Sequence, residues 1–176
     1  MVSVDFVVEL PESNGKDAIM VVVDSVTKRS HFVSTVTTLT AAATSQLYLW
    51  HIWKHHGLPK KVVSDWGPQF VTEFMKELYR LLGVKLAATT AYHPQGDGQM
   101  ERVNQELEQF LGLFINQRQD DWDELLPIAE FQYNNHIHSA TKNIPFLLDT
   151  GRWNREKGIV TWPSHDKHVI QYNLDR

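Results

Sequence analysis

The order of the apolar segments constrains the fold of this chain more than any other feature. Three segments rich in Val, Ile, Thr and Phe come first, at residues 2–10, 18–26 and 30–38. Because β-branched and aromatic residues favour strands, these segments are predicted to be three strands. Amphipathic patterns and shorter apolar runs follow in the order helix, strand, helix, strand, helix, helix. This order predicts an α/β domain.

The first helical pattern has a recognisable start and end. Thr40 is a suitable N-cap, and Gly57 suits the end of a helix that runs through residue 56. Leu47, Trp50 and Trp53 are expected to face the core of the domain. Later strands are expected at 60–64 and 84–88, and later helices at 70–82, 99–117 and beyond 121.

The helical and strand patterns weaken after residue 151. Residues 1–152 are therefore predicted to form one domain, which is an ordinary length for a single hydrophobic core. Residues 153–176 are predicted to form a divergent, irregular C-terminal tail.

The composition excludes several classes of protein. The chain has no cysteine, which excludes disulfides, thiolate zinc sites and a cysteine nucleophile. No apolar run reaches the roughly 18 residues of a membrane span, so no membrane partner is expected. The net charge of −4 argues against nucleic-acid binding by bulk electrostatics, so a DNA-acting chain of this charge needs a local patch, metal ions or further domains.

Several of the histidines lie close together in the sequence, as the ligands of a metal site often do. A zinc site needs three or four convergent ligands, and no cysteine is available to supply one. The sequence therefore favours histidines on helix surfaces, at His51, His55, His56, His136 and His138.

Carboxylates follow or interrupt three of the apolar segments. Asp65 comes after Val-Val-Ser and before a Gly-Pro turn, an order by which open α/β sheets present ligands at strand ends. Asp5 lies within an apolar strand, where an ionised carboxylate without a partner costs several kcal/mol if buried. Asp24 ends another apolar run and has the same difficulty. The residues alone do not rank Asp5 above Asp24.

A third acidic position lies on the predicted helix at 99–117. The apolar stripe of this helix has the 3, 4, 7 spacing of a core-facing surface, at Val103, Leu107, Phe110, Leu111 and Phe114. Glu101 falls roughly opposite that stripe, on the same face as Gln105. On an isolated helix Glu101 would simply be exposed to solvent. The turn-rich loop before it, at 92–98, instead favours a functional site that includes Glu101.

Carboxylates on separate elements suit hard divalent cations. Mg²⁺ and Mn²⁺ prefer oxygen ligands and accept phosphate oxygens alongside them. Two such ions about 4 Å apart activate an attacking oxygen and stabilise a leaving oxygen at phosphorus. This chemistry needs no protein nucleophile, in agreement with the absence of cysteine, of a Gly-x-Ser-x-Gly elbow and of a Walker-type loop.

Several long motifs carry a resemblance to a known family. They are, in order, VSVDFVVELP, VVVDSVTKRSHF, HGLPKKVVSDWGPQF, AYHPQGDGQMERVNQELE, DDWDELLPIAEFQYNNHIHSAT and PFLLDTGR. With them, the chain resembles the catalytic core of gypsy-type LTR retrotransposon integrases, within the superfamily of retroviral integrases and DDE transposases. The 35 residues between Asp65 and Glu101 also match the D,D-35-E signature of that family.

The resemblance implies a fold and an activity. The fold expected is ribonuclease H-like, a five-stranded mixed sheet flanked by helices. Asp5, rather than Asp24, matches the family's first catalytic aspartate, and Asp65 and Glu101 match the other two acids. These three are expected to be the catalytic residues and the ligands of two Mg²⁺ or Mn²⁺ ions. The implied reactions are processing of the 3′ ends of element DNA and strand transfer into target DNA.

The resemblance also implies partners. DNA is the expected partner, with contacts from the loop at 92–98 and the helix after it. These contacts are assigned to Tyr92, Gln95, Asp97, Asn104 and Gln105. A homodimer or higher homo-oligomer and a nuclear location are expected, although the chain carries no targeting signal.

Two residues depart from the family pattern. Trp66 follows the second aspartate where the family usually has a polar or basic residue, and Met100 replaces a small polar residue before Glu101. An indole beside a metal ligand either stacks on a base or blocks the site. The alternative function is therefore a catalytically inactive, integrase-derived module for DNA binding or protein interaction. A ribonuclease H that cuts RNA–DNA hybrids shares the fold and metals but not the long motifs.

Overall fold

The computed structural model describes residues 1–84, 98–117, 119–152, 160–161 and 169–170. Its strands are β1 (Val2–Val7), β2 (Ala18–Asp24), β3 (Ser30–Thr35), β4 (Val62–Val63), β5 (Val160–Thr161) and β6 (Val169–Ile170). Its helices are α1 (Ala41–Tyr48), a π-helical turn η1 (Leu49–Trp53), α2 (Lys54–His56), α3 (Gly67–Leu81), α4 (Gly98–Phe114), α5 (Trp122–Asn135) and α6 (Pro145–Thr150). The order confirms the predicted α/β class.

The central sheet is mixed, as expected. Its strand order in the described residues is β3-β2-β1-β4, with β1 antiparallel to β2, β2 antiparallel to β3 and β1 parallel to β4. This is four strands where five were predicted. The fifth was expected at 84–88, and all of it except Val84, which is not in a strand, lies outside the described residues.

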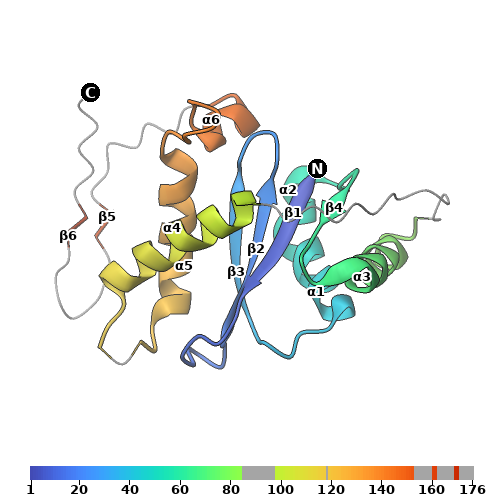
Figure 1. Ribbon diagram of the computed structural model, residues 1–176, viewed down its shortest axis with the longest axis horizontal. Helices are drawn as coiled ribbons and strands as arrows, with labels where there is room; N and C mark the ends of the chain where they lie inside the picture. Colours follow the sequence, from blue (N-terminus) through green and yellow to red (C-terminus); the bar gives the residue numbers. More distant parts are fainter. Residues whose placement is uncertain (85–97, 118, 153–159, 162–168, 171–176) are drawn as a thin grey trace.

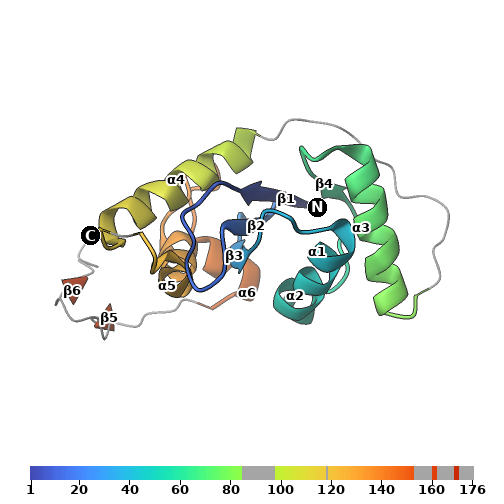
Figure 2. The ribbon, with the colours of Figure 1, turned by 90° about the horizontal axis from the view of Figure 1, so that it is seen from below.

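Helices cover both faces of the sheet and make two cores (Figures 1 and 2). On one face, Val4 and Phe6 of β1 pack with α1, η1 and α3, whose buried side chains include Tyr48 and Phe74. On the other face, Val7 packs with residues of β2, α4 and α5. This division follows from the alternation of side chains along a strand, which sends neighbouring residues of β1 to opposite faces.

The helical segment after Thr40 shows one error of the sequence interpretation. Thr40 is the N-cap, because its hydroxyl accepts from the backbone N–H of Ala43 at 3.2 Å. The residues that face the core are Tyr48 and Ile52, whereas Trp50 is 69% exposed. Trp50 lies two positions after Tyr48, about 200° around the helix, so one helix cannot bury both against the same sheet. Trp53 is likewise exposed, and Leu47 is partly buried.

The edge strand β3 is fixed by a side chain of α5. The side chain of Asn134 is fully buried, accepts from the backbone N–H of Ser30 at 2.9 Å and donates to its carbonyl at 2.7 Å. These two bonds reproduce the pattern of a neighbouring strand on the open edge of β3.

The C-terminal region is not uniformly irregular. α6 ends at Gly151, whose φ of 67° lies in the left-handed region that favours glycine. Strands β5 and β6 form a short antiparallel pair within the predicted tail. None of the helices that the structure describes has the length and apolar character needed to cross a membrane.

Candidate active site

The parallel pairing of β1 and β4 places two of the predicted catalytic residues side by side. Val2 pairs with Val62 and Ser3 with Val63, a constant offset of 60 positions. Continued by two residues, the same offset brings Asp5 opposite Asp65, which follows the end of β4. The register of two short strands therefore builds this pair of carboxylates.

Asp5 is held from two directions. One carboxylate oxygen, Oδ1, accepts from the backbone N–H of Phe6 at 2.8 Å. The other, Oδ2, accepts from Nδ2 of Asn104 on α4, also at 2.8 Å. Asn104 was predicted as a DNA contact, and its observed partner here is Asp5; the DNA contact stays a prediction.

Asp65 shows the electrostatic consequence of this arrangement. Its pKa is raised above the ordinary value by partial desolvation, by the negative charge of Asp5 and by a side-chain hydrogen bond with Asp5. Two carboxylates this close resist being ionised together, because each disfavours the charge on the other. A bound cation would remove that repulsion.

Glu101 lies in the first turn of α4, three residues before Asn104. Residues three apart on a helix are neighbours on its surface, so Glu101 is on the side of α4 that reaches Asp5. Glu101 is exposed, and the structure shows no hydrogen bond or ion pair between it and either aspartate. The fold thus brings Asp5 and Asp65 together, with Glu101 near them but not joined to them.

The donor chemistry of these residues fits the expected metals. Carboxylate oxygens on three elements are hard ligands of the kind that Mg²⁺ and Mn²⁺ prefer. The closeness of Asp5 and Asp65, whose mutual repulsion contributes to the raised pKa of Asp65, favours a cation here. Across the described ranges, no group of three or more His, Asp or Glu side chains is already positioned around one point as a metal site.

The remaining predicted DNA contacts have different outcomes. Tyr92, Gln95 and Asp97 lie outside the described residues. Gln105 is exposed on α4, next to Asn104. Its position leaves it open to a ligand, and the predicted DNA contact stays a prediction.

Trp66 forms part of an aromatic cluster beside the carboxylates. Its ring centroid lies 4.4 Å from that of Phe6 and 5.2 Å from that of Phe70. Phe6 and Trp66 each directly follow one of the paired aspartates, so the same 60-residue offset that pairs the acids pairs these rings. Trp66 nevertheless remains 38% exposed.

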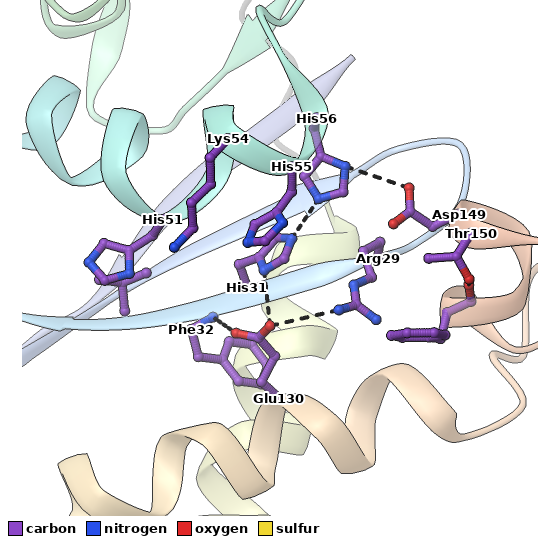
Figure 3. Close-up of a pocket in the computed structure, with 12 residues that line it drawn as sticks. Arg29, His31, Phe32, His51, Lys54, His55, His56, Glu130, Asp149 and Thr150 are labelled. Atoms are coloured by element: carbon purple, nitrogen blue, oxygen red, sulfur yellow. Dashed lines mark hydrogen bonds and ion pairs between the residues drawn. The ribbon is translucent and has the colours of Figure 1, made fainter. Parts of the chain in front are cut away.

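A second cluster of polar residues, which the sequence did not indicate, lies at the edge strand β3, at the end of the strand order opposite β4 (Figure 3). His31 of β3 contacts Glu130 of α5 and His56 of α2, and His56 faces Asp149 of α6. Burial lowers the pKa of His56 despite the nearby carboxylate of Asp149. His31 gave no sequence signal, because its partners are 25 and 99 positions away.

Comparisons with known proteins agree with this geometry. No protein-family model matches the chain. The transposon Tf2-3 and Tf2-4 polyproteins of Schizosaccharomyces pombe are each 32% identical to it over 146 residues. The match covers 83% of this chain and 11% of each polyprotein, so the chain spans about a tenth of the length of these curated relatives.

Solved structures show the same fold. The catalytic core domain of HTLV-2 integrase, solved in complex with magnesium, is 16% identical, with a TM-score of 0.58 over 84% of this chain and 95% of that one. The catalytic core domain of BIV integrase is 20% identical, with a TM-score of 0.58 over 85% and 93%. A chain of a simian T-cell lymphotropic virus intasome is 18% identical, with a TM-score of 0.60 over 85% and 53%.

The fold is therefore that of integrase catalytic cores, which are ribonuclease H-like. More particularly, the resemblance to the integrase catalytic core of a retrotransposon is confirmed by the polyprotein relatives. A gypsy-type origin is consistent with them.

Proposed function

We propose that residues 1–152 are the catalytic core of a Mg²⁺- or Mn²⁺-dependent integrase that performs 3′-end processing and strand transfer. The observation that carries the proposal is the interaction of Asp5 on β1 with Asp65, two residues after the neighbouring parallel strand β4. Water is the attacking group in the first reaction and the new 3′ hydroxyl in the second.

The residues of the site have separate tasks in this proposal. Asp5, Asp65 and Glu101 hold the cations, and Asn104 keeps one oxygen of Asp5 in place by its 2.8 Å hydrogen bond. When bound, the cations supply activation of the attacking oxygen and stabilisation of the leaving oxygen. Glu101 lies three residues before Asn104 on α4, so it is on the side of the helix from which Asn104 reaches Asp5.

The test is disintegration, the reversal of strand joining on a branched DNA oligonucleotide, in Mn²⁺. Wild type is expected to release the joined strand, and Glu101→Gln is expected to lose this activity while its far-UV circular dichroism is unchanged. Glu108→Gln is the matched control, because Glu108 is exposed on the same helix. If Glu101→Gln were as active as wild type, the assignment of Glu101 would be wrong.

A second candidate function is an inactive module that retains the fold. The observation in its favour is Trp66, a partly exposed indole packed directly beside the paired aspartates. Thermal unfolding with Mn²⁺ separates the two functions. A working site gains stability from the metal, and Asp65→Asn loses that gain; an inactive module shows the same melting temperature with and without metal.

The proposed partners follow the relatives. The HTLV-2 integrase core was solved in dimeric and trimeric forms, and another structural neighbour belongs to an intasome. We propose that this chain likewise forms a homodimer or higher homo-oligomer, that DNA is its substrate, and that it acts in the nucleus. With a net charge of −4, much of the DNA affinity has to come from the metals or from other parts of a longer protein.

A further inference from the structure

A cavity of about 540 Å³ lies beside the edge strand β3, on elements that do not carry the paired aspartates (Figure 3). Its walls come from β3, the η1–α2 segment, α5 and α6. The residues at its centre are His31, His56, Glu130 and Asp149, with His55 beside them. These elements are distant in sequence, so only the folded chain assembles the cluster.

Each of the two central histidines has a carboxylate at one ring nitrogen. Nδ1 of His31 lies 2.9 Å from Oε1 of Glu130, and the other oxygen of Glu130 accepts from the backbone N–H of Phe32 at 3.0 Å. Nδ1 of His56 lies 3.5 Å from Oδ1 of Asp149. An ionised carboxylate only accepts hydrogen bonds, so the proton of each neutral ring belongs on Nδ1.

This arrangement leaves the lone pairs of both rings at Nε2. The two Nε2 atoms face each other at 2.8 Å. Two nitrogens at that distance need a proton or a metal cation between them, because their lone pairs would otherwise repel, and a divalent cation can take the place of the proton. A carboxylate on the far nitrogen of an imidazole is the usual outer partner of a metal-bound histidine, because it fixes the tautomer and the ring orientation.

We propose that His31 and His56 bind a divalent transition metal of the Zn²⁺ type through their Nε2 atoms, with Glu130 and Asp149 as the outer partners. Imidazole ligands select such metals over Mg²⁺, which prefers oxygen. Two tetrahedral Zn–N bonds hold their nitrogens about 3.3 Å apart, so the two rings move apart by about 0.5 Å on binding.

His55 is the available third ligand. Its ring centroid is 6.3 Å from that of His31 and 6.2 Å from that of His56, and its side chain is exposed at the end of α2. The described residues contain no ready group of three ligands. A rotation of His55, or water in its place, therefore completes the coordination, and the affinity is lower than that of a preformed four-ligand zinc site.

The carboxylates of Glu130 and Asp149 provide two negative charges around the pair. Two positive side chains of the same cavity offset them, because Arg29 lies 4.0 Å from Glu130 and 4.4 Å over the ring of Phe146, and Lys54 also lines the cavity. A metal here would join α2 to β3 directly, and both of them to α5 and α6 through the carboxylates. The site would thus stabilise the sheet edge formed by β3, which lies at the other end of the strand order from β4 and Asp65.

The experiment is equilibrium dialysis of the full chain against ZnCl₂ at pH 7.5, together with thermal unfolding in Zn²⁺ and in Mg²⁺. Wild type is expected to bind one Zn²⁺ at this site and to melt at a higher temperature with it. His56→Ala is expected to lose at least tenfold in Zn²⁺ affinity, and Asp149→Asn about tenfold, the usual effect of removing an outer partner. His55→Ala should weaken binding less than His56→Ala.

The controls separate this site from the others. His51→Ala removes an exposed histidine of the same cavity and is expected to bind Zn²⁺ like wild type. Asp65→Asn is also expected to retain it, so failure of the proposed catalytic function leaves this result unaffected. Zn²⁺ affinity that is the same in wild type and His56→Ala would overturn the proposal, as would an equal loss in His51→Ala.

Discussion

Asn104 on α4 donates a hydrogen bond of 2.8 Å to Asp5 on β1. The bond joins a helix and a strand that are 99 positions apart, at the point where Asp65 also arrives. The oxygen of the same side-chain amide, Oδ1 of Asn104, is buried and has no hydrogen-bond partner among the described residues. The orientation of this amide therefore depends on Asp5 as much as Asp5 depends on it.

Replacement of Asn104 by Ala should affect the site more than the fold. One hydrogen bond to a charged group is lost, which costs about 1.5–3 kcal/mol at most, and the unpaired Oδ1 disappears with it. We expect urea unfolding to show a loss in the lower part of that range and disintegration activity to fall at least tenfold. Gln105→Ala, on the exposed neighbouring position, is the control. Equal activity in both variants would remove Asn104 from the site.

Replacement of Asp65 by Asn should stabilise the metal-free protein at neutral pH. The pKa of Asp65 is raised in the folded state, so the folded chain holds this proton more tightly than the unfolded chain. Stability is thus lost as the pH rises from the ordinary value of 3.8 through the raised pKa. We expect Asp65→Asn to melt a few degrees higher than wild type at pH 7. Below the ordinary pKa of 3.8, where Asp65 is protonated in both states, the two proteins should melt at the same temperature.

Differential scanning calorimetry in EDTA at pH 7 and at pH 3.5 measures this effect. Glu108→Gln removes an exposed negative charge elsewhere on the surface and should not reproduce it. A lower melting temperature for Asp65→Asn at pH 7 would contradict the repulsion between Asp5 and Asp65.

Replacement of Tyr48 by Phe should stabilise the core. Tyr48 is fully buried, and its hydroxyl has no hydrogen-bond partner among the described residues. Burial also raises its pKa above the usual range. Removal of an unsatisfied buried hydroxyl is expected to add about 1 kcal/mol to the free energy of unfolding. The ring contact with Phe74, at 5.5 Å between centroids, is retained.

Tyr133 provides the matched control for that experiment. Burial raises its pKa to about 12, but its hydroxyl has a hydrogen bond with Ser30. Tyr133→Phe should therefore lower the midpoint of urea unfolding while Tyr48→Phe raises it. A lower midpoint of urea unfolding in both variants would show that the hydroxyl of Tyr48 has a hydrogen-bond partner.

Replacement of Asn134 by Ala should be among the most destabilising changes on α5. It removes both hydrogen bonds to Ser30 and leaves buried backbone groups of β3 unpaired, at about 1–3 kcal/mol for each. Asn135→Ala, which loses one bond to a carbonyl of its own helix, should cost about 1 kcal/mol or less. Hydrogen exchange at the amide of Ser30 tests the mechanism, because it should accelerate in Asn134→Ala alone.

Local patterns in the sequence were enough to predict the first four strands, the N-cap and Asp65, whereas only the family resemblance placed Asp5 ahead of Asp24. A strand that ends in an acid and a turn is readable from neighbouring residues, which is why Asp65 was found and why its position beside Asp5 agrees with the expectation. The inward orientation of Trp50 was wrong, because hydrophobicity alone assigned it to the core. The stripe that is buried contains Tyr48 and Ile52.

The features that the sequence did not predict all depend on long-range partners. Asn134 was noticed only as part of a family motif, and its bonds to Ser30 span 104 positions. His31 has an unremarkable place in a strand, and its contacts come from residues of two other elements. Without a periodic or local motif, such contacts follow from the packed fold alone.

The contact between Asp5 and Asp65 depends on the few residues that follow β4 more than on the length of the chain between β1 and β4. Insertions in the loops between these strands change the numbering of the paired residues but not which residues pair, because the loops absorb the added length. A single residue inserted between Val63 and Asp65 has a different effect, because it moves Asp65 one position farther from β4 and puts Ser64 or the inserted residue in its place opposite Asp5. An insertion at that point would therefore separate the two carboxylates while leaving both strands intact.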